Sequence, residues 1–599
     1  MVVQGKYMNN LLKVIGGQTE EKAAVFASKI LICLLILTAT CFKVSAQVSL
    51  TATSGIPAGS YSTLKQAFDA INSGIHQGDI IIYINSNTNE GATPATLNSG
   101  NADPASYSSI LIQPANPNIT VTGNPAAGFG VIQLNGADNV TINGDNPNTP
   151  GQNRDLTINN TATATQTGNS VIRVATSSAV TSADNISILN CILNGNVTSG
   201  NASGITTNTT STNISFGIYV GGNAGATVTG APTAIVSDVA NAAPAGTTVN
   251  AFVAQNNEIN QCGRAIEFNG GNSSVCNSVS ITGNTIGTNA VLGAYPYTTP
   301  ATTVYTVGIW VAGANAVSIT GNTINNVISY VGILTSGISL FGNIGSGTIS
   351  IADNIISGVA NNGTSPLSIT SGIDISSGGT YTISGNDIST ISNQSGFPNV
   401  PASGIRINSN SRPGTIESNK ITAVLNKGAS PAEGINLFNA ASGMLIRNNF
   451  ISNVLNGGNN TFGVTANANG ILLNSGSNHK VYHNSVNMTG VNSSTSTNSI
   501  NCIAIASSAQ TGIDIRNNIF SNTVGGGSLS NAYSCVFLPF AVSAGMNLTI
   551  NNNAYFTGTT AGKHAIAFAG TAAYNAANLY TVANFNPYTT LGATNWRSI

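Results

Sequence analysis

The 599-residue sequence is poor in charge and in aromatic side chains. Charged residues make up 6 % of the chain, against roughly 25 % in an average domain, and aromatic residues also make up 6 %. Such a composition is often typical of disorder. Here, however, isoleucine and valine recur with a regular spacing, which indicates an ordered and buried face.

The start of the chain has the pattern of a secretory leader. Lys29 supplies a positive flank, residues 30–40 form an apolar run too short to span a bilayer, and Val44-Ser45-Ala46 resembles a small-residue cleavage site. Beyond residue 46 there are 13 basic and 17 acidic side chains, which excludes a basic surface for nucleic acid. No later stretch is long and apolar enough for a transmembrane helix.

Two short patterns fill most of the remaining chain. The first is apolar-x-x-Asn-x-apolar, and successive asparagines are 30–38 residues apart. These asparagines are Asn284, Asn322, Asn354, Asn386, Asn419, Asn449, Asn484 and Asn518. The second is Gly-Ile-x-apolar, which begins at Gly308, Gly337, Gly372, Gly404, Gly434 and Gly470. A fixed period of this size predicts a solenoid.

The residue types within each period predict a parallel β-helix. Alternating β-branched residues such as Ile373 and Ile375 point to one side of a strand, so their stacked copies form an interior column. We expect the repeated Asn to mark a bend, to adopt left-handed backbone and to form an amide ladder between coils.

The segments outside the regular repeat define the predicted organisation. Residues 1–46 are the leader, and 47–109 form an N-terminal cap with an amphipathic helix over 61–71 followed by a strand. Residues 110–556 form the all-β solenoid, with an inserted lobe at 221–250 that is rich in Ala, Gly and Thr. Residues 557–599 form a C-terminal cap or the start of a further segment. Terminal caps protect the open edges of a solenoid.

The strand pair and the Asn pattern resemble those of right-handed parallel β-helix proteins of the pectate-lyase-like superfamily, over residues 110–556. Three segments, 64–71, 78–84 and 551–556, look like parts of large secreted bacterial surface proteins. The resemblance implies a location outside the cell or on the outer surface of a bacterial cell. It leaves the activity open, because this fold carries lyases, hydrolases, adhesins and stalks alike.

The period aligns outward positions from coil to coil. The third place of the Gly-Ile-x-apolar strand holds Glu267, Trp310, Ser339, Asp374, Arg406 and Asn436. Opposite charges are expected to meet in neighbouring coils at Asp374/Arg406, Asp387/Lys420, Glu417/Arg447 and Lys480/Asp514. These pairs are interpreted as cross-strand ion pairs that set the register. Alternatively, Trp310, Asp374, Arg406 and Glu267 form a carbohydrate-binding face.

Evidence for catalysis in the sequence is thin. Glycoside hydrolysis needs two carboxylates about 5–9.5 Å apart, and Asp353 with Asp387 is the best candidate pair. The resemblance implies clustered acids for Ca²⁺ in a lyase, or paired Asp, Gly-His-Gly and Arg-x-Lys motifs in a pectin hydrolase, and neither pattern is present.

The sequence gives equally little evidence for a metal site or for reactive thiols. His479 and His483 have helical ligand spacing but fall in a strand and a bend. Asp138, Asp145 and Asp155 lack the spacing of a Ca²⁺ loop and are interpreted as turn residues. We expect no cofactor, and Ca²⁺ is not indicated.

Cys502 and Cys535 replace the repeat's Gly in consecutive coils. Coils about 4.8 Å apart would permit a disulfide there, and buried free thiols are the alternative.

The sequence thus predicts a secreted or cell-surface β-helix with a structural or adhesive role and with polysaccharides or surface glycans as partners. The alternative is a polysaccharide lyase or glycoside hydrolase that acts in a lateral groove.

Overall fold

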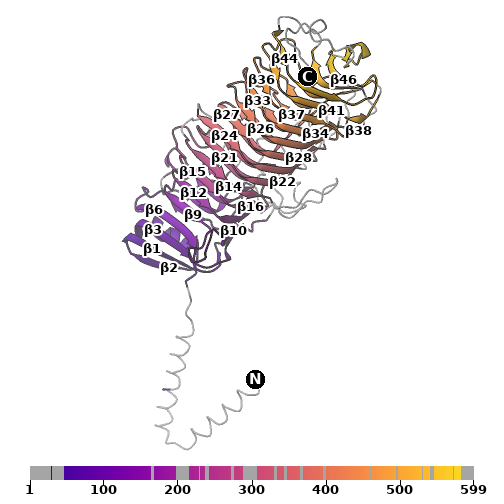
Figure 1. Ribbon diagram of the computed structural model, residues 1–599. Coiled ribbons are helices and arrows are strands. Elements are labelled where there is room, and N and C mark those ends of the chain that lie inside the picture. Colours follow the sequence, from indigo (N-terminus) through magenta and orange to yellow (C-terminus); the bar gives the residue numbers. More distant parts are fainter. Residues whose placement is uncertain are drawn as a thin grey trace, which may run out of the picture. The chain divides into compact units, whose positions relative to one another are not determined.

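The computed structural model describes residue 29 and residues 46–163, 168–196, 215–227, 229–235, 242–270, 276–287, 306–329, 334–342, 347–363, 368–394, 400–428, 430–457, 462–465, 467–493, 497–528, 530–539, 546–570 and 573–581. The chain divides into two units, Met1–Ala46 and Gln47–Ile599. The predicted leader lies outside the described residues apart from Lys29 and Ala46. The second unit is an all-β parallel solenoid (Figure 1).

Three long sheets, here called A, B and C, run along this solenoid, and each coil contributes one strand to each sheet. In stacking order, sheet A contains β2 (Ala58–Tyr61), β1 (Val48–Gly55), β3 (His76–Ile84), β6 (Tyr107–Pro114), β9 (Val140–Asn143), β12 (Ile186–Leu189), β15 (Phe252–Gln255), β18 (Val279–Thr282), β21 (Val317–Thr320), β24 (Thr348–Ala352), β27 (Thr380–Ser384), β30 (Thr415–Glu417), β33 (Leu445–Arg447), β36 (Lys480–Tyr482), β40 (Asp514–Arg516) and β44 (Thr549–Asn551). Sheet B contains β4 (Thr88–Asn89), β7 (Ile119–Gly123), β10 (Leu156–Asn160), β13 (Cys191–Asn194), β16 (Glu258–Asn260), β19 (Thr285–Ile286), β22 (Thr323–Ser329), β25 (Ile355–Asn361), β28 (Asp387–Asn393), β31 (Lys420–Asn426), β34 (Phe450–Asn456), β37 (Ser485–Met488), β41 (Ile519–Asn522) and β45 (Ala554–Thr557). Sheet C contains β5 (Ala95–Asn98), β8 (Gly130–Asn135), β11 (Ser170–Ala175), β14 (Phe216–Gly221), β17 (Arg264–Asn269), β20 (Val307–Ala312), β23 (Thr335–Gly342), β26 (Thr370–Ser377), β29 (Ala402–Ile407), β32 (Ala432–Asn436), β35 (Ala468–Leu473), β39 (Ser499–Ile505), β43 (Ala532–Leu538), β46 (His564–Ala569) and β47 (Leu579–Tyr580). A separate two-stranded sheet pairs β38 (Val491–Asn492) with β42 (Gly525–Gly526).

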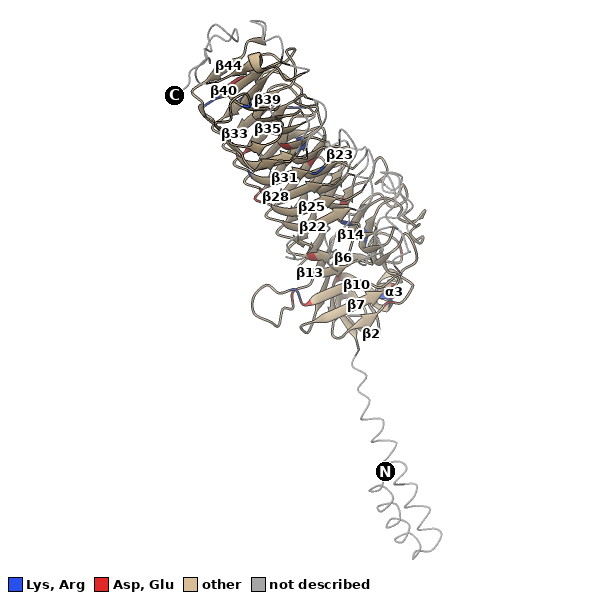
Figure 2. Cartoon of the chain, turned by 90° about the vertical axis from the view of Figure 1, so that its right-hand side faces the viewer, with Lys and Arg blue, Asp and Glu red and all other residues tan. Residues whose placement is uncertain are grey.

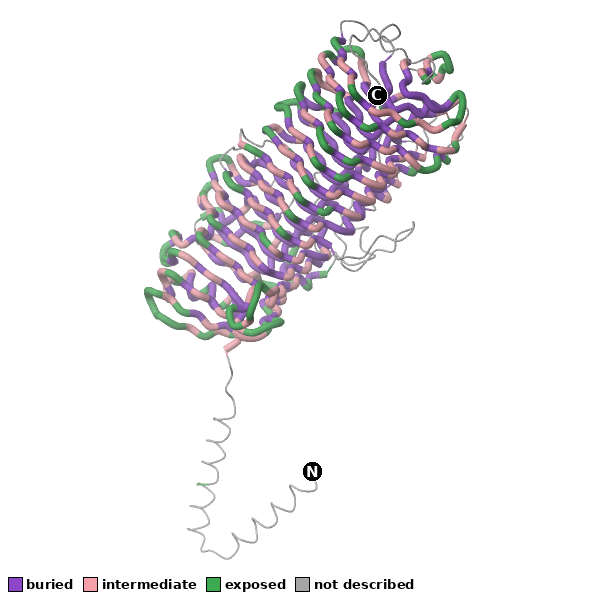
Figure 3. Tube along the Cα trace, in the orientation of Figure 1, coloured by how far each residue is buried: buried purple, intermediate pink, exposed green. Residues whose placement is uncertain are grey.

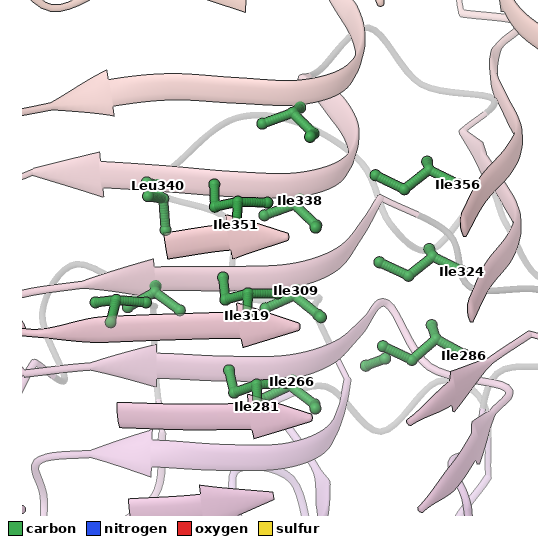
Figure 4. Packing of buried hydrophobic residues seen from close by; sticks show 14 of the residues in the cluster. Ile266, Ile281, Ile286, Ile309, Ile319, Ile324, Ile338, Leu340, Ile351 and Ile356 are labelled. Atoms are coloured by element: carbon green, nitrogen blue, oxygen red, sulfur yellow. The ribbon is translucent and has the colours of Figure 1, made fainter. Parts of the chain in front are cut away.

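The interior of the solenoid is a column of aliphatic side chains. Ile309 stacks on Ile338 in sheet C, Ile319 on Ile351 in sheet A, and Ile324 on Ile356 in sheet B. Figure 4 shows the three stacks converging from the three sheets on one interior. Every residue labelled in that view is fully buried. The period of two along each strand therefore places one apolar set inside, as the burial of alternate residues along β27 illustrates. Figure 3 shows buried and less buried residues alternating along the stacked coils.

The repeated asparagines stand in one buried column at the bend between sheets A and B. Each side-chain amide donates to Oδ1 of the next asparagine at 2.8–3.0 Å, from Asn257 through to Asn553. The same amide also donates to a sheet A carbonyl of the preceding coil, as Asn322 does to Ile281 at 2.9 Å. The column thus begins one coil before Asn284 and ends one coil after Asn518.

The expectation that these asparagines adopt left-handed backbone is wrong. The left-handed residue is the one immediately before each of them, with φ between 53° and 67°. The residues concerned are Asn256, Gly283, Gly321, Asp353, Gly385, Ser418, Asn448, His483, Asn517 and Asn552. Because this residue makes the turn, the asparagine after it is free to point its side chain inward.

The repeated glycine that opens each Gly-Ile-x-apolar segment is explained by steric contact and not by backbone conformation. A Cβ on Gly404 would lie 2.6 Å from the Gly434 carbonyl oxygen and 2.4 Å from Cγ2 of Ile421. Its counterparts from Gly308 to Gly470 meet the same two kinds of atom at 2.3–2.8 Å. Close approach of neighbouring coils, and not positive φ, favours glycine at this place, although Cys502 and Cys535 occupy it in two later coils.

The N-terminal end of the solenoid contains an antiparallel element that the sequence pattern did not indicate. Strand β1 pairs antiparallel with both β2 and β3, and parallel pairing begins with β3 and β6. A helix, α3 (Leu64–Asn72), is N-capped by Thr63, whose side chain accepts from the Gln66 amide. Its buried residues include Leu64, Phe68 and Ile71.

The expected inserted lobe falls between β14 and β15, which end at Gly221 and begin at Phe252. Among the described residues between them, Ile235 packs on Phe216 and Tyr219 of sheet C. Arg173, fully buried on β11, donates to the carbonyls of Gly222 at 3.3 Å and Asn223 at 2.8 Å. A buried guanidinium thus holds the start of this segment against sheet C.

At the C-terminal end, β46 continues sheet C in parallel and β47 then pairs with it in the antiparallel sense. A 3₁₀ turn, Ala576–Asn578, precedes β47. Residues 582–599 of the expected C-terminal segment lie outside the described residues. Of the helices in the described part of the chain, none has the length and hydropathy needed to cross a membrane.

Candidate functional site

Charged side chains are sparse on the solenoid, and several lie on sheet C (Figure 2). The third places of the repeat stand in register: Glu267, Trp310, Ser339, Asp374, Arg406 and Asn436 are successive neighbours on β17, β20, β23, β26, β29 and β32. We call these six residues the outer row, because they point away from the aliphatic column. All six are nevertheless buried, with at most 7 % of each exposed. The expectation that they decorate the solvated surface is wrong.

Trp310 is engaged on both sides by other side chains. Its ring stacks on Phe341 with centroids 6.0 Å apart and an interplanar angle of 27°. The Arg264 guanidinium lies 5.0 Å from the Trp310 ring centroid, and the same guanidinium pairs with Glu267 at 2.7 Å. Trp310 is 7 % exposed, whereas Phe341 beside it is 41 % exposed. Phe341 is therefore the ring that this cluster presents to solvent.

The predicted pair of Asp374 and Arg406 forms inside this row. Arg406 Nη1 donates to Asp374 Oδ1 at 2.8 Å, and Ser376 Oγ donates to the other carboxylate oxygen at 2.9 Å. The guanidinium carbon also lies 4.8 Å from the ring centroid of Phe438, which is 46 % exposed. Arg406 thus joins a buried carboxylate to a half-exposed aromatic ring.

Glu433 is not among the residues that the patterns above single out. It occupies the place before the repeated glycine, where neighbouring coils carry Ser336, Ser371, Ser403, Asn469 and Asn501. Aligning that place would have revealed it, because it is the one carboxyl in a run of hydroxyl and amide side chains.

The Glu433 carboxyl is 1 % exposed and accepts from Ser403 Oγ at 2.9 Å. Burial raises its pKa to about 8, against the opposing effects of Ser403, Arg406 and Asn436. The raised pKa favours the protonated carboxyl at neutral pH, and a protonated carboxyl can both donate and accept hydrogen bonds.

A pocket of about 270 Å³ opens beside Glu433. It is lined by Pro401, Pro431, Glu433, Asn436, Phe438, Thr465, Leu472 and Asn474. One outer-row residue, Asn436, lies in its wall, and the Arg406 partner Phe438 lies at the same pocket. The combination of apolar walls with a few polar groups is typical of small-molecule sites.

The candidate catalytic acids lie elsewhere, at the bend between sheets A and B. Asp353 is the exposed left-handed residue before Asn354. The Asp387 carboxylate accepts from Lys420 Nζ at 2.8 Å. Asp387 thus belongs to an ion pair between neighbouring coils.

Two of the remaining predicted ion pairs form and one does not. Asp387 pairs with Lys420, and Glu417 pairs with Arg447 at 2.6 Å. Lys480 and Asp514 are neighbours in register, but Asp514 pairs with Arg516 of its own strand at 2.6 Å and accepts from Tyr482 at 2.8 Å. A partner two residues away along an extended strand competes successfully for the carboxylate.

His479, Asp138 and Asp145, which were weighed as metal ligands, are engaged in hydrogen bonds within the protein. His479 contacts the Ser475 carbonyl through Nε2 at 2.7 Å and accepts from the Met444 amide at Nδ1. Asp138 accepts from Ser182 and Asp184, and Asp145 from the Asn153 amide. Within the described ranges, no three His, Cys, Asp or Glu side chains gather into a group that could hold a metal ion.

Cys502 and Cys535 are buried free thiols in neighbouring coils, so the predicted alternative to the disulfide holds.

No protein-family model matches the chain, and the comparison with curated proteins gives no match either.

Proposed function

We propose that this chain is a secreted or cell-surface β-helical protein with a structural or adhesive role, and that it binds an extended polysaccharide along the outer face of sheet C. The parallel solenoid supports this proposal, since stacked coils offer a long, regular surface. The observation that carries it is the half-exposed Phe438 ring beside the pocket that Glu433 and Asn436 line.

The proposal also includes the handedness of the coils, the superfamily, the role of helix α3 and the location of the protein. We assign the coils a right-handed sense and the chain to the pectate-lyase-like superfamily, on the strand pair and the asparagine column. Helix α3 acts as a cap in this proposal, since its apolar residues contact the first coils. Residues 1–46 are a leader that directs export, and the protein acts outside the cell or on its outer surface.

The polysaccharide contact is centred on Phe438 and not on Trp310. Sugar rings pack on aromatic faces that solvent can reach, and Phe438 is 46 % exposed whereas Trp310 is 7 % exposed. Asp374 holds the Arg406 guanidinium, which lies over the Phe438 ring and supports it. Glu267 and Trp310 form a separate buried cluster with Arg264.

Affinity measurements on a polysaccharide panel test this proposal. Phe438→Ala is expected to weaken binding at least tenfold, because it removes the exposed ring. Phe450→Ala is the matched control: Phe450 is 45 % exposed on sheet B and is expected to leave affinity unchanged. No binding by the wild-type protein, or equal losses for the two variants, would overturn the proposal.

One observation favours the alternative of a polysaccharide lyase or glycoside hydrolase. Glu433 has a pKa of about 8, and a carboxyl that stays protonated at neutral pH can act as a general acid. Hydrolysis also needs a second carboxylate about 5–9.5 Å away. The nearby Asp374 is held by Arg406 and Ser376. A screen for reducing ends and for unsaturated products over the same panel decides between binding and turnover, and Glu433→Gln would abolish any Glu433-dependent activity.

A further inference from the structure

The pocket beside Glu433 contains a polar atom that lacks a partner. Asn436 is 2 % exposed, and its Oδ1 accepts no hydrogen bond within the described part of the chain. A buried acceptor without a donor costs about 1–3 kcal/mol. Less than 1 Å² of this oxygen is exposed, so a ligand hydroxyl group in the pocket that Asn436 lines can satisfy it when the Asn436 side chain rotates.

The second polar group of the pocket is equally suited to hydroxyl groups. Ser403 donates to Oε2 of Glu433 at 2.9 Å, and Asn436 also contacts this carboxyl. The nearby cation, Arg406, is already paired with Asp374 at 2.8 Å. Among the described groups that influence the Glu433 carboxyl, Arg406 is the only cation, and it is already paired.

The size and walls of the pocket restrict what it can hold. Its volume of about 270 Å³ is below the roughly 300–1,000 Å³ of pockets for drug-sized ligands, so it suits one ring and not a chain. Leu472, Pro401 and Pro431 supply apolar wall, and Phe438 supplies an aromatic face. A single sugar ring has both an apolar face and hydroxyl edges.

We infer that this pocket is a subsite for one uncharged sugar residue, with Asn436 and Glu433 binding its hydroxyl groups beside Phe438, and that it excludes uronate residues. This inference rests on the proposed polysaccharide binding and narrows its ligand class. A uronate carboxylate would lose its hydration beside the acceptor oxygen of Asn436 and the Glu433 carboxyl, and the desolvation of an unpaired anion is strongly unfavourable. A neutral sugar carries no such penalty.

The test compares neutral and acidic ligands on the intact wild-type protein. Titration with neutral β-glucan, galactan and mannan is compared with titration with polygalacturonate and alginate, and monosaccharides serve as competitors. A neutral hexose is expected to compete, whereas galacturonate and glucuronate do not. Tighter binding of the uronate polymers, or effective competition by uronates, would overturn the inference without needing any variant.

Two variants test whether the neutral sugar binds at this pocket. Asn436→Ala is expected to weaken binding of the neutral polysaccharide about tenfold. Asn408→Ala, at a partly buried amide that does not line the pocket, is expected to leave binding unchanged. If Phe438→Ala abolishes binding while Asn436→Ala has no effect, the subsite assignment fails and the proposed function stands. If no polysaccharide binds at all, both fail.

Discussion

Arg406 and Asp374 form an ion pair at 2.8 Å across two neighbouring coils, and their side chains are only 7 % and 0 % exposed. The pair sits on the outer face of sheet C, where a solvated contact was expected. Its environment makes it energetically different from the other inter-coil pairs, which face water. Lys420 and Asp387 also meet at 2.8 Å, with side chains 56 % and 43 % exposed.

Arg406→Met is therefore expected to destabilise the solenoid by about 3–5 kcal/mol, because it leaves a buried carboxylate without its partner. Lys420→Met, the matched surface variant, is expected to cost less than about 1 kcal/mol. Urea denaturation followed by circular dichroism measures both. Similar losses in the two variants would contradict the role assigned to burial.

Asn386→Ala tests the asparagine column. Asn386 donates to Asn419 Oδ1 at 2.9 Å and to the Ile351 carbonyl at 3.0 Å, and it accepts from both nitrogens of Asn354. Its loss is expected to cost about 2–4 kcal/mol, since several buried groups lose a partner. Thermal unfolding compares it with Asn408→Ala, for which less than about 0.5 kcal/mol is expected. A small effect at Asn386 would mean that packing alone holds the bend.

The two kinds of repeated glycine predict different costs for the same substitution. Gly321 has φ of 66° and nothing within 4 Å of an added Cβ, so Gly321→Ala is expected to cost only the left-handed strain, about 1 kcal/mol. Gly321→Asn should cost less, because asparagine tolerates this backbone. Gly404→Ala would place Cβ 2.6 Å from a backbone oxygen and is expected to cost about 3 kcal/mol. The melting temperatures of the three variants check this order.

Glu433 predicts a pH dependence of stability. Its pKa is raised in the folded protein from 4.5 to about 8, with Ser403, Arg406 and Asn436 facing it. The protonated carboxyl is favoured by folding, so its contribution is fully present below pH 4.5 and is lost as pH rises through 8. A shift of that size corresponds to about 5 kcal/mol at most. The free energy of unfolding is expected to fall across this window in the wild type and to fall less in Glu433→Gln. Parallel pH profiles of the two proteins would contradict the assignment.

The local pattern of the chain was sufficient to predict the parallel, stacked coils of the regular repeats. A period of 30–38 residues, with β-branched residues alternating within each strand, requires a shared interior, because only stacked coils bury every apolar set. The same period predicted which residues become neighbours, including Asp374 with Arg406 and Glu417 with Arg447. Both results follow from strand geometry, which depends on sequence spacing alone.

Three features depended on the tertiary structure. The bend places left-handed φ on the residue before each asparagine, and the burial of Trp310 and Asp374 comes from packing on the outside of sheet C. The pocket at Glu433 and Phe438 includes Thr465 and Asn474, which come from a following coil. Periodicity determines which side of a strand a residue faces. How deeply that residue is buried depends on the irregular segments between strands, and these segments have no repeating sequence pattern from which burial could be predicted.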